Sequence, residues 1–146
     1  MIAACGRFCP FPIYLVDTSV WARRTLPSVA EAITDLTRSG ELGTCALLTA
    51  EVCYSARNGA EYRQLRALLD ATIMLNGDDL VEEKALAAQA KLAAEGQHRT
   101  SVVDLFVAAT AAAHEAVVLH YDSDYERICA AVGARTRWVV PRGSVA

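Results

Sequence analysis

The sequence has no long apolar segment and no excess of positive charge. No run approaches the roughly 20 consecutive apolar residues that a helix needs to cross a bilayer, so we expect no membrane association. The 146 residues carry a formal net charge of -3, which argues against a protein that coats nucleic acid through bulk electrostatics alone. Internal repeats and an interdomain linker are also lacking. These absences favour a globular protein whose function resides in a local site.

Paired cysteine motifs are missing as well. The five cysteines are an odd number and contain no CxxC pair, which indicates reduced thiols and a cytoplasmic protein. Cys45, Cys53 and Cys129 stand inside apolar patterns, where cysteine behaves as a small buried hydrophobe. Cys5 and Cys9 lie in the N-terminal segment, and the sequence leaves their redox state open.

The first dozen residues are apolar but interrupted by Arg7, Pro10 and Pro12. A secretory signal needs a longer unbroken apolar run, so none is predicted. We expect an irregular N-terminal extension over residues 1–12 and a single domain over residues 13–146, a usual domain size.

Short apolar runs alternate with segments of helical spacing along the rest of the chain. The runs predict strands over residues 13–16, 42–48, 72–75, 117–121 and 137–140. The helical segments cover residues 18–24, 27–39, 49–55, 61–69, 80–95, 101–115 and 125–132. Strands that alternate with helices predict an α/β fold, with a mostly parallel sheet covered by helices on both faces.

Four acidic residues stand next to predicted helix starts. Asp17 ends the first strand, Glu51 enters the helix after the second strand, and Asp104 lies in the first turn of a later helix. Asp122 follows the strand 117–121, with Asp124 two residues further on. Because the carboxyl ends of parallel strands lie along one edge of a sheet, we expect Asp17, Glu51 and Asp122 to converge there. Asp104 joins them if its helix packs with its N-terminus at the same edge.

Each acid taken singly also has a simple structural explanation. Asp17 can cap a helix, and Glu51 can complement a helix dipole behind Thr49 as N-cap. The pairs Ser101–Asp104 and Ser123–Glu126 have the spacing of a capping box. Capping explains one acid better than it explains four.

Four carboxylates brought together repel one another unless a cation offsets their charge. Oxygen ligands without histidine or cysteine favour Mg²⁺ or Mn²⁺ over zinc. Such an ion can activate water for attack on a phosphodiester. The residue types therefore predict a metal-dependent phosphodiesterase site.

Four segments resemble the PIN-domain family, and most closely the VapC toxins of bacterial toxin–antitoxin pairs. They are YLVDTSVW, LLTAEV, DLFVAATAAAH and VVLHYDSDYERI, and the resemblance runs from about Ile13 to Val140. It implies a PIN-like three-layer sandwich and a Mg²⁺- or Mn²⁺-dependent endoribonuclease that cleaves structured RNA such as tRNA or rRNA.

The resemblance also implies roles for individual residues. Asp17 and Asp104 would be the principal metal ligands, and Glu51 and Asp122 would complete the acidic pocket. Asp124 competes with Asp122 for the fourth position. The hydroxyl residues that follow the first acid, Thr18 and Ser19, would form hydrogen bonds around it.

Two kinds of partner follow from the resemblance, a second copy of the chain in a homodimer and a VapB-type antitoxin whose tail fills the acidic groove. RNA binding also needs cationic side chains near the acids. Arg23, Arg24, His98 and Arg99 are the candidates for phosphate contacts, and the alternative is that they form a solvated helix face.

Two other classes of function compete with the nuclease. A catalytically silent PIN domain would keep the antitoxin interface and serve as a binding module. A different acid-based α/β enzyme fits poorly, because Ser19 stands where haloacid-dehalogenase-like phosphatases place a second aspartate. Phospho-accepting receivers need a late lysine, and the last lysine here is Lys91.

Overall fold

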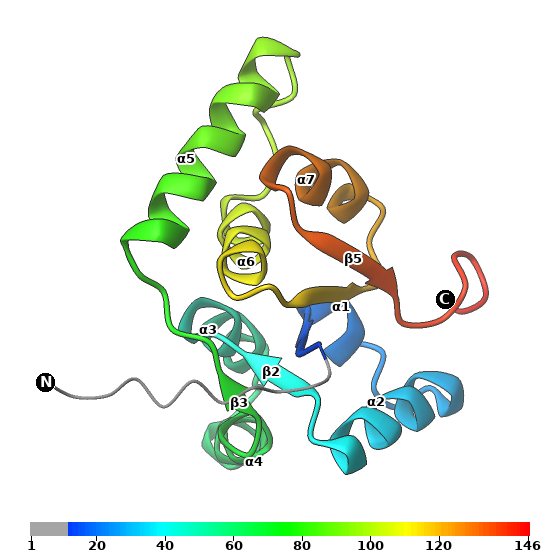
Figure 1. The fold of residues 1–146 in the computed structure, drawn as a ribbon. Coiled ribbons are helices and arrows are strands. Elements are labelled where there is room, and N and C mark those ends of the chain that lie inside the picture. The colour runs from blue at the N-terminus through cyan, green and yellow to red at the C-terminus, as the bar shows by residue number, and fades with distance from the viewer. Residues whose placement is uncertain (1–11) are drawn as a thin grey trace, which may run out of the picture.

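The fold is built from short parallel strands joined by helices (Figure 1). The computed structural model describes residues 12–146, so the predicted extension over residues 1–12, with Cys5 and Cys9, falls almost wholly outside the described residues. The elements of the described chain are β1 (Tyr14–Val16), α1 (Thr18–Trp21), α2 (Pro27–Ser39), β2 (Leu42–Thr44), α3 (Ala46–Tyr54), α4 (Gly59–Asp70), β3 (Ile73–Met74), α5 (Asp79–Ala94), α6 (Val102–Ala113), β4 (Val117–His120), α7 (Asp124–Val132) and β5 (Arg135–Trp138).

The sheet has the strand order β3-β2-β1-β4-β5, and every pairing is parallel. In its register, Leu15 of β1 lies opposite Gly43 of β2 and Val118 of β4. The chain builds outward from β1 to β3, then returns to the other side of β1 for β4 and β5. This reversal places a topological switch point between β1 and β4, where open α/β sheets bind ligands at the carboxyl ends of their strands.

Helices lie on both sides of the sheet, which confirms the predicted α/β architecture. In Figure 1 the strands run between α5, α6 and α7 above and α2 and α4 below. Helices α5, α6 and α7 also pack on one another, and their buried positions include many alanines, which permit close approach of helix backbones. These are Ala85, Ala88, Ala108, Ala109 and Ala111.

Three cysteines of the described chain, Cys45, Cys53 and Cys129, are buried free thiols, as the sequence predicts. Among residues 12–146, no helix combines the length and the apolar character needed to span a bilayer.

The apolar run over residues 42–48 contains both the end of a strand and the start of a helix. The prediction of a strand through Leu48 and of Thr49 as the helix N-cap is therefore wrong. Strand β2 ends at Thr44, Cys45 is the extended N-cap residue, and α3 begins one residue later. The Thr49 hydroxyl instead forms a buried 2.9 Å hydrogen bond with that of Thr44. Periodicity over a run of only seven residues does not separate a strand from a helical turn.

Two other local predictions also need correction. Strand β5 covers Arg135–Trp138, two residues before the predicted position, because it is an edge strand whose exposed residues give no apolar signal. Ser123 makes no side-chain capping bond at the start of α7. Ser101 does cap α6, since its hydroxyl accepts a 3.2 Å hydrogen bond from the backbone N–H of Asp104.

Candidate functional site

Three of the predicted acids converge at the carboxyl end of β1. Asp17 follows β1 directly, Glu51 comes from α3, and Asp104 comes from the first turn of α6. Each offers one carboxylate oxygen such that all three oxygens lie within 4.8 Å of one another. We call these three residues the carboxylate triad.

Asp17 is the most buried member of the triad, with 4% of its surface exposed. Its backbone N–H donates to the carbonyl of Leu119 in the neighbouring strand β4, at 2.9 Å. Its Oδ2 caps α1 by accepting a 2.8 Å hydrogen bond from the N–H of Ser19. The Asp17 side chain therefore both caps α1 and contributes an oxygen to the carboxylate triad. The capping bond fixes the direction in which its carboxylate points.

The two hydroxyl residues after Asp17 connect the site to its surroundings. The Thr18 hydroxyl donates to Glu51 Oε2 at 2.7 Å, so it orients the second acid of the triad. The Ser19 hydroxyl accepts from the backbone N–H of Tyr121 at 2.9 Å, which ties α1 to the end of β4. Of these two residues, Ser19 bonds to the Asp17 carboxylate through its backbone N–H, and the Thr18 side chain bonds to Glu51 instead.

The electrostatics of the site disfavour three ionised carboxylates. The pKa of Asp104 is raised from 3.8 to about 7, first by burial and then by the charge of Asp17, with smaller contributions from Glu51 and Asp122; a hydrogen bond from Tyr125 opposes part of this rise. The triad alone is therefore a site of unbalanced negative charge, and a cation would relieve it.

Asp122 does not join the carboxylate triad among the described residues. Its Oδ1 accepts a 3.0 Å hydrogen bond from the backbone N–H of Asp124, and its own N–H donates to Nδ1 of His120 at 3.2 Å. Its charge still contributes to the raised pKa of Asp104. Asp124 lies further out, with its side chain 57% exposed and 3.7 Å from the guanidinium of Arg127.

A tyrosine that no sequence pattern marks reaches the centre of the site. The hydroxyl of Tyr125, on α7, lies 2.6 Å from Asp17 Oδ1 and 3.1 Å from Asp104 Oδ1. Burial and the charges of these two aspartates raise the pKa of Tyr125, so its hydroxyl stays protonated and acts as a donor. No spacing or motif rule identifies this residue, because its contact partners are 108 and 21 positions away.

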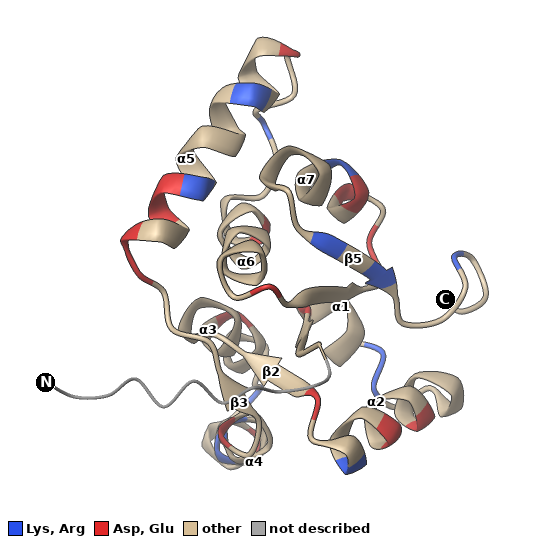
Figure 2. Ribbon diagram, viewed as in Figure 1, with Lys and Arg blue, Asp and Glu red and all other residues tan. Residues whose placement is uncertain are grey.

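The predicted cationic residues do not gather at the triad. Arg23 donates to the carbonyls of Ser19 and Ala146, both at 2.9 Å, and its guanidinium lies over the ring of Tyr121. Arg24 donates to the carbonyl of Trp21. His98 and Arg99 are exposed in the loop between α5 and α6. Figure 2 shows basic segments on that loop, on the connection from α1 to α2 and on β5.

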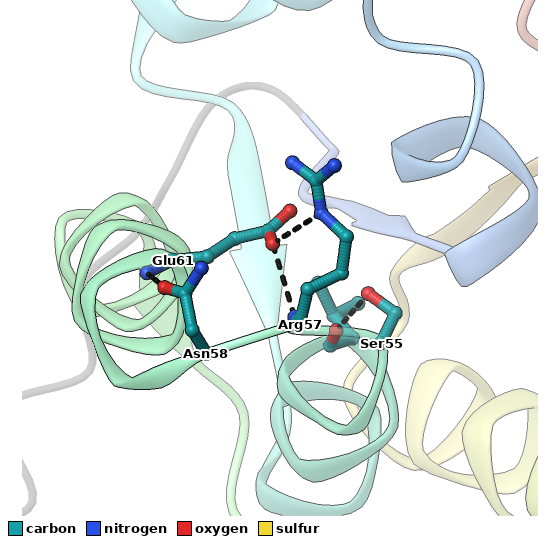
Figure 3. Close-up of polar contacts among 5 residues, drawn as sticks. Ser55, Arg57, Asn58 and Glu61 are labelled. Atoms are coloured by element: carbon teal, nitrogen blue, oxygen red, sulfur yellow. Dashed lines mark hydrogen bonds and ion pairs between the residues drawn. The ribbon is translucent and has the colours of Figure 1, made fainter.

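A further arginine near the start of α4 is held in an ion pair (Figure 3). Arg57 Nε lies 2.9 Å from Glu61 Oε2, and the same oxygen accepts the backbone N–H of Arg57 at 3.0 Å. Asn58 caps the helix by accepting from the N–H of Glu61 at 2.9 Å. This pair neutralises one positive charge beside α3.

The raised pKa of Asp104 leads to a stability prediction for the metal-free protein. Because its pKa is higher in the folded state, the stability that this group contributes is present below about pH 4 and is lost as the pH rises to about 7. Asp104→Asn replaces the carboxyl with an amide that does not ionise, so the variant does not lose this stability as the pH rises. The rise from 3.8 to about 7 corresponds to about 4 kcal/mol. At pH 8 we expect the free energy of unfolding of Asp104→Asn to exceed that of the wild type by about half of this value, about 2 kcal/mol, because solvent screens a partly exposed group.

The measurement is urea unfolding in EDTA at pH 4.5 and pH 8 for the wild type and Asp104→Asn. The difference in free energy of unfolding in favour of Asp104→Asn should be larger at pH 8 than at pH 4.5. The control Asp35→Asn changes an exposed acid on α2 and should show no such growth. An equal difference at both pH values would mean that the Asp104 carboxylate is not held against its neighbours.

The sequence model of the PIN domain matches residues 14–131. This stretch contains the whole carboxylate triad and Asp122. The chain therefore belongs to the PIN domain family.

Close relatives within this family carry the name VapC. The chain is 37% identical over 132 residues to Ribonuclease VapC51 of Mycobacterium tuberculosis, covering 90% of this chain and 96% of that protein. It is 33% identical over 136 residues to Ribonuclease VapC18 of the same organism, covering 91% and 99%. Both alignments extend over nearly the full length of each protein.

Solved structures share the fold at lower sequence identity. VapBC2 from Rickettsia felis, bound to a promoter DNA fragment, superposes with a TM-score of 0.72 and 14% identity, covering 86% of this chain and 98% of that one. DNA-bound VapBC from Salmonella typhimurium gives 0.70 and 18%, covering 89% and 100%. At these identities the likeness shows the fold alone.

Proposed function

We propose that this chain is a metal-dependent endoribonuclease, the toxin component of a toxin–antitoxin pair, that hydrolyses phosphodiester bonds in structured RNA. The observation that carries the proposal is the carboxylate triad within 4.8 Å, in a chain that is 37% identical to a protein named as a ribonuclease. The triad stands at the switch point of the sheet, the expected position for a ligand.

The donor set fits Mg²⁺ or Mn²⁺. All three converging groups are carboxylates, the hard oxygen ligands that these ions prefer. Their 4.8 Å spread is slightly wider than the roughly 4.2 Å between opposite ligands of one Mg²⁺, so small side-chain movements suffice. A bound divalent ion supplies charge stabilisation for a phosphate and activation of water.

We assign separate tasks to the residues of the site. Asp17 and Asp104 hold the ion, and Glu51 completes the carboxylate triad under the direction of Thr18. Asp122 acts from the rim, where its second oxygen is available to orient or deprotonate the attacking water.

The proposal also includes an RNA substrate and protein partners. A phosphodiester backbone brings negative charge to an acidic centre, so the ion must mediate the contact, and basic residues away from the triad hold the rest of the RNA. His98 and Arg99 are exposed and available for this task, whereas Arg23 and Arg24 already use donors on backbone carbonyls. We propose tRNA or rRNA as the substrate class, a VapB-type antitoxin as the partner, and a homodimer as the assembly.

Removing the metal tests the proposal. Purified protein is incubated with total RNA in Mg²⁺, in EDTA, and in EDTA followed by excess Mg²⁺ or Mn²⁺. We expect EDTA to lower the rate of cleavage by at least about a hundredfold, because ion catalysis contributes several kcal/mol. Re-added metal should restore the rate, and sequencing of new RNA 5′ ends should reveal a limited set of cut sites.

Cleavage that persists at full rate in EDTA would contradict a metal-dependent mechanism. A wild-type protein that binds Mn²⁺ but cuts no RNA would favour the silent binding module instead.

A further inference from the structure

The site contains a hydrogen-bond donor that bridges two acids from different parts of the fold. The hydroxyl of Tyr125 contacts Oδ1 of both Asp17 and Asp104, at 2.6 and 3.1 Å. The tyrosine is fully buried and comes from the first turn of α7, so a third element fixes how the ends of β1 and α6 meet.

The other hydrogen bonds of the triad show which carboxylate oxygens are occupied and which are free to bind a cation. Asp17 Oδ2 accepts from the N–H of Ser19, and Glu51 Oε2 accepts from the hydroxyl of Thr18. Within residues 12–146, Asp104 Oδ2 and Glu51 Oε1 accept no hydrogen bond from the protein. Each aspartate thus accepts from Tyr125 through its Oδ1. The orientation of the Asp104 carboxylate depends on Tyr125, because no other side chain of the described residues bonds to that carboxylate.

The ring of Tyr125 is supported independently of its hydroxyl. It packs against the buried ring of His120, with centroids 5.3 Å apart, and His120 in turn packs on Trp138 at 4.9 Å. Phenylalanine preserves the ring and its packing, so a Tyr125→Phe variant removes only the bridge.

We propose that Tyr125 is a positioning residue of the metal site, whose hydroxyl holds Asp17 and Asp104 in the orientation that binds a divalent ion. The inference rests on the proposed function, in which these aspartates are the principal ligands. Outer-shell groups that orient metal ligands typically change metal affinity by about 10- to 100-fold when they are lost.

The test is calorimetric titration of the metal-free protein with Mn²⁺ alone. We compare the wild type, Tyr125→Phe and the control Tyr14→Phe, which removes a phenol that accepts a hydrogen bond from Arg137 outside the triad. The dissociation constant for Mn²⁺ should rise by about 10-fold or more in Tyr125→Phe and stay unchanged in Tyr14→Phe. Circular dichroism verifies that all three proteins are folded.

A rescue separates positioning from a purely structural role. Tyr125→4-aminophenylalanine keeps an N–H donor on the same ring, whereas Tyr125→4-fluorophenylalanine keeps the volume without a donor. The amino variant should bind Mn²⁺ within a few-fold of the wild type, and the fluoro variant should bind as weakly as Tyr125→Phe. The comparison of the amino and fluoro variants also tests the role of the Tyr125 hydroxyl if Tyr125→Phe fails to fold.

Equal Mn²⁺ affinity of donor and non-donor variants overturns the inference, as does a wild type that binds no Mn²⁺. Failure of the proposed function is distinguishable from failure of this inference. If the wild type cuts RNA while Tyr125→Phe binds Mn²⁺ normally, only the role of Tyr125 is wrong. If the expected Mn²⁺ affinities are found but no RNA is cut, only the ribonuclease is wrong.

Discussion

Asp17→Asn should lower the rate of RNA cleavage by at least about a thousandfold, the upper part of the range for removing one preorganised electrostatic group. The substitution removes one negative charge from the carboxylate triad and therefore weakens its hold on a cation. It also disturbs the local bonding, since Asp17 accepts from both Ser19 and Tyr125. An asparagine amide has one acceptor oxygen and would present its NH₂ group to one of these donors.

The measurement is the initial rate of cleavage of total RNA at saturating Mg²⁺, with growth arrest on expression as a second readout. Asp79→Asn, at an exposed position in the first turn of α5, is the control and should keep the wild-type rate. All variants are purified in the same way, so a contaminating ribonuclease would appear equally in each. A rate for Asp17→Asn within tenfold of the wild type would remove Asp17 from the proposed mechanism.

Leu15→Ala should lower the free energy of unfolding by about 3 kcal/mol, within the range of about 2 to 5 kcal/mol for buried leucines. Leu15 is fully buried in β1, which pairs with β2 on one side and β4 on the other. Truncation leaves a cavity that two paired neighbouring strands cannot collapse to fill. A loss of this size is a large part of the 5–15 kcal/mol typical of a domain.

Equilibrium unfolding in urea, with EDTA present, measures the effect. Leu86→Ala makes the same chemical change on α5 at a side chain that is 60% exposed, and we expect it to stay within about 0.5 kcal/mol of the wild type. Similar losses for the two variants would mean that β1 does not lie at the centre of the core.

The candidate site was predicted from where its acids fall relative to the strands and helices. The residues next to each acid suggested only a helix cap. Four acids were expected at one edge of a parallel sheet, and among the described residues the structure brings together Asp17, Glu51 and Asp104 but not Asp122. The capping alternative and the convergence are both correct for Asp17, because a carboxylate has two oxygens and uses one for the N–H of Ser19. Capping and metal binding are therefore compatible at this residue.

Local patterns were less informative where a short apolar run crosses from a strand into a helix. The run over residues 42–48 is apolar except for Thr44, yet it changes from strand to helix at Cys45. So short a run is compatible with a strand or with a helical turn, so its pattern does not mark the change. At β5 the opposite holds, since exposed arginines in an edge strand conceal a real strand.

The sequence by itself determined the alternation of strands and helices, the parallel sheet and the acids that end on its edge, because these depend on local periodicity and on the order of elements. Only the tertiary structure decided that Asp122 stands outside the triad, that Thr18 serves Glu51, and that Tyr125 joins two aspartates. Such contacts depend on side-chain direction across segments far apart in the chain. Hydrogen bonds form or fail over a few tenths of an ångström, a precision that spacing along a sequence does not contain.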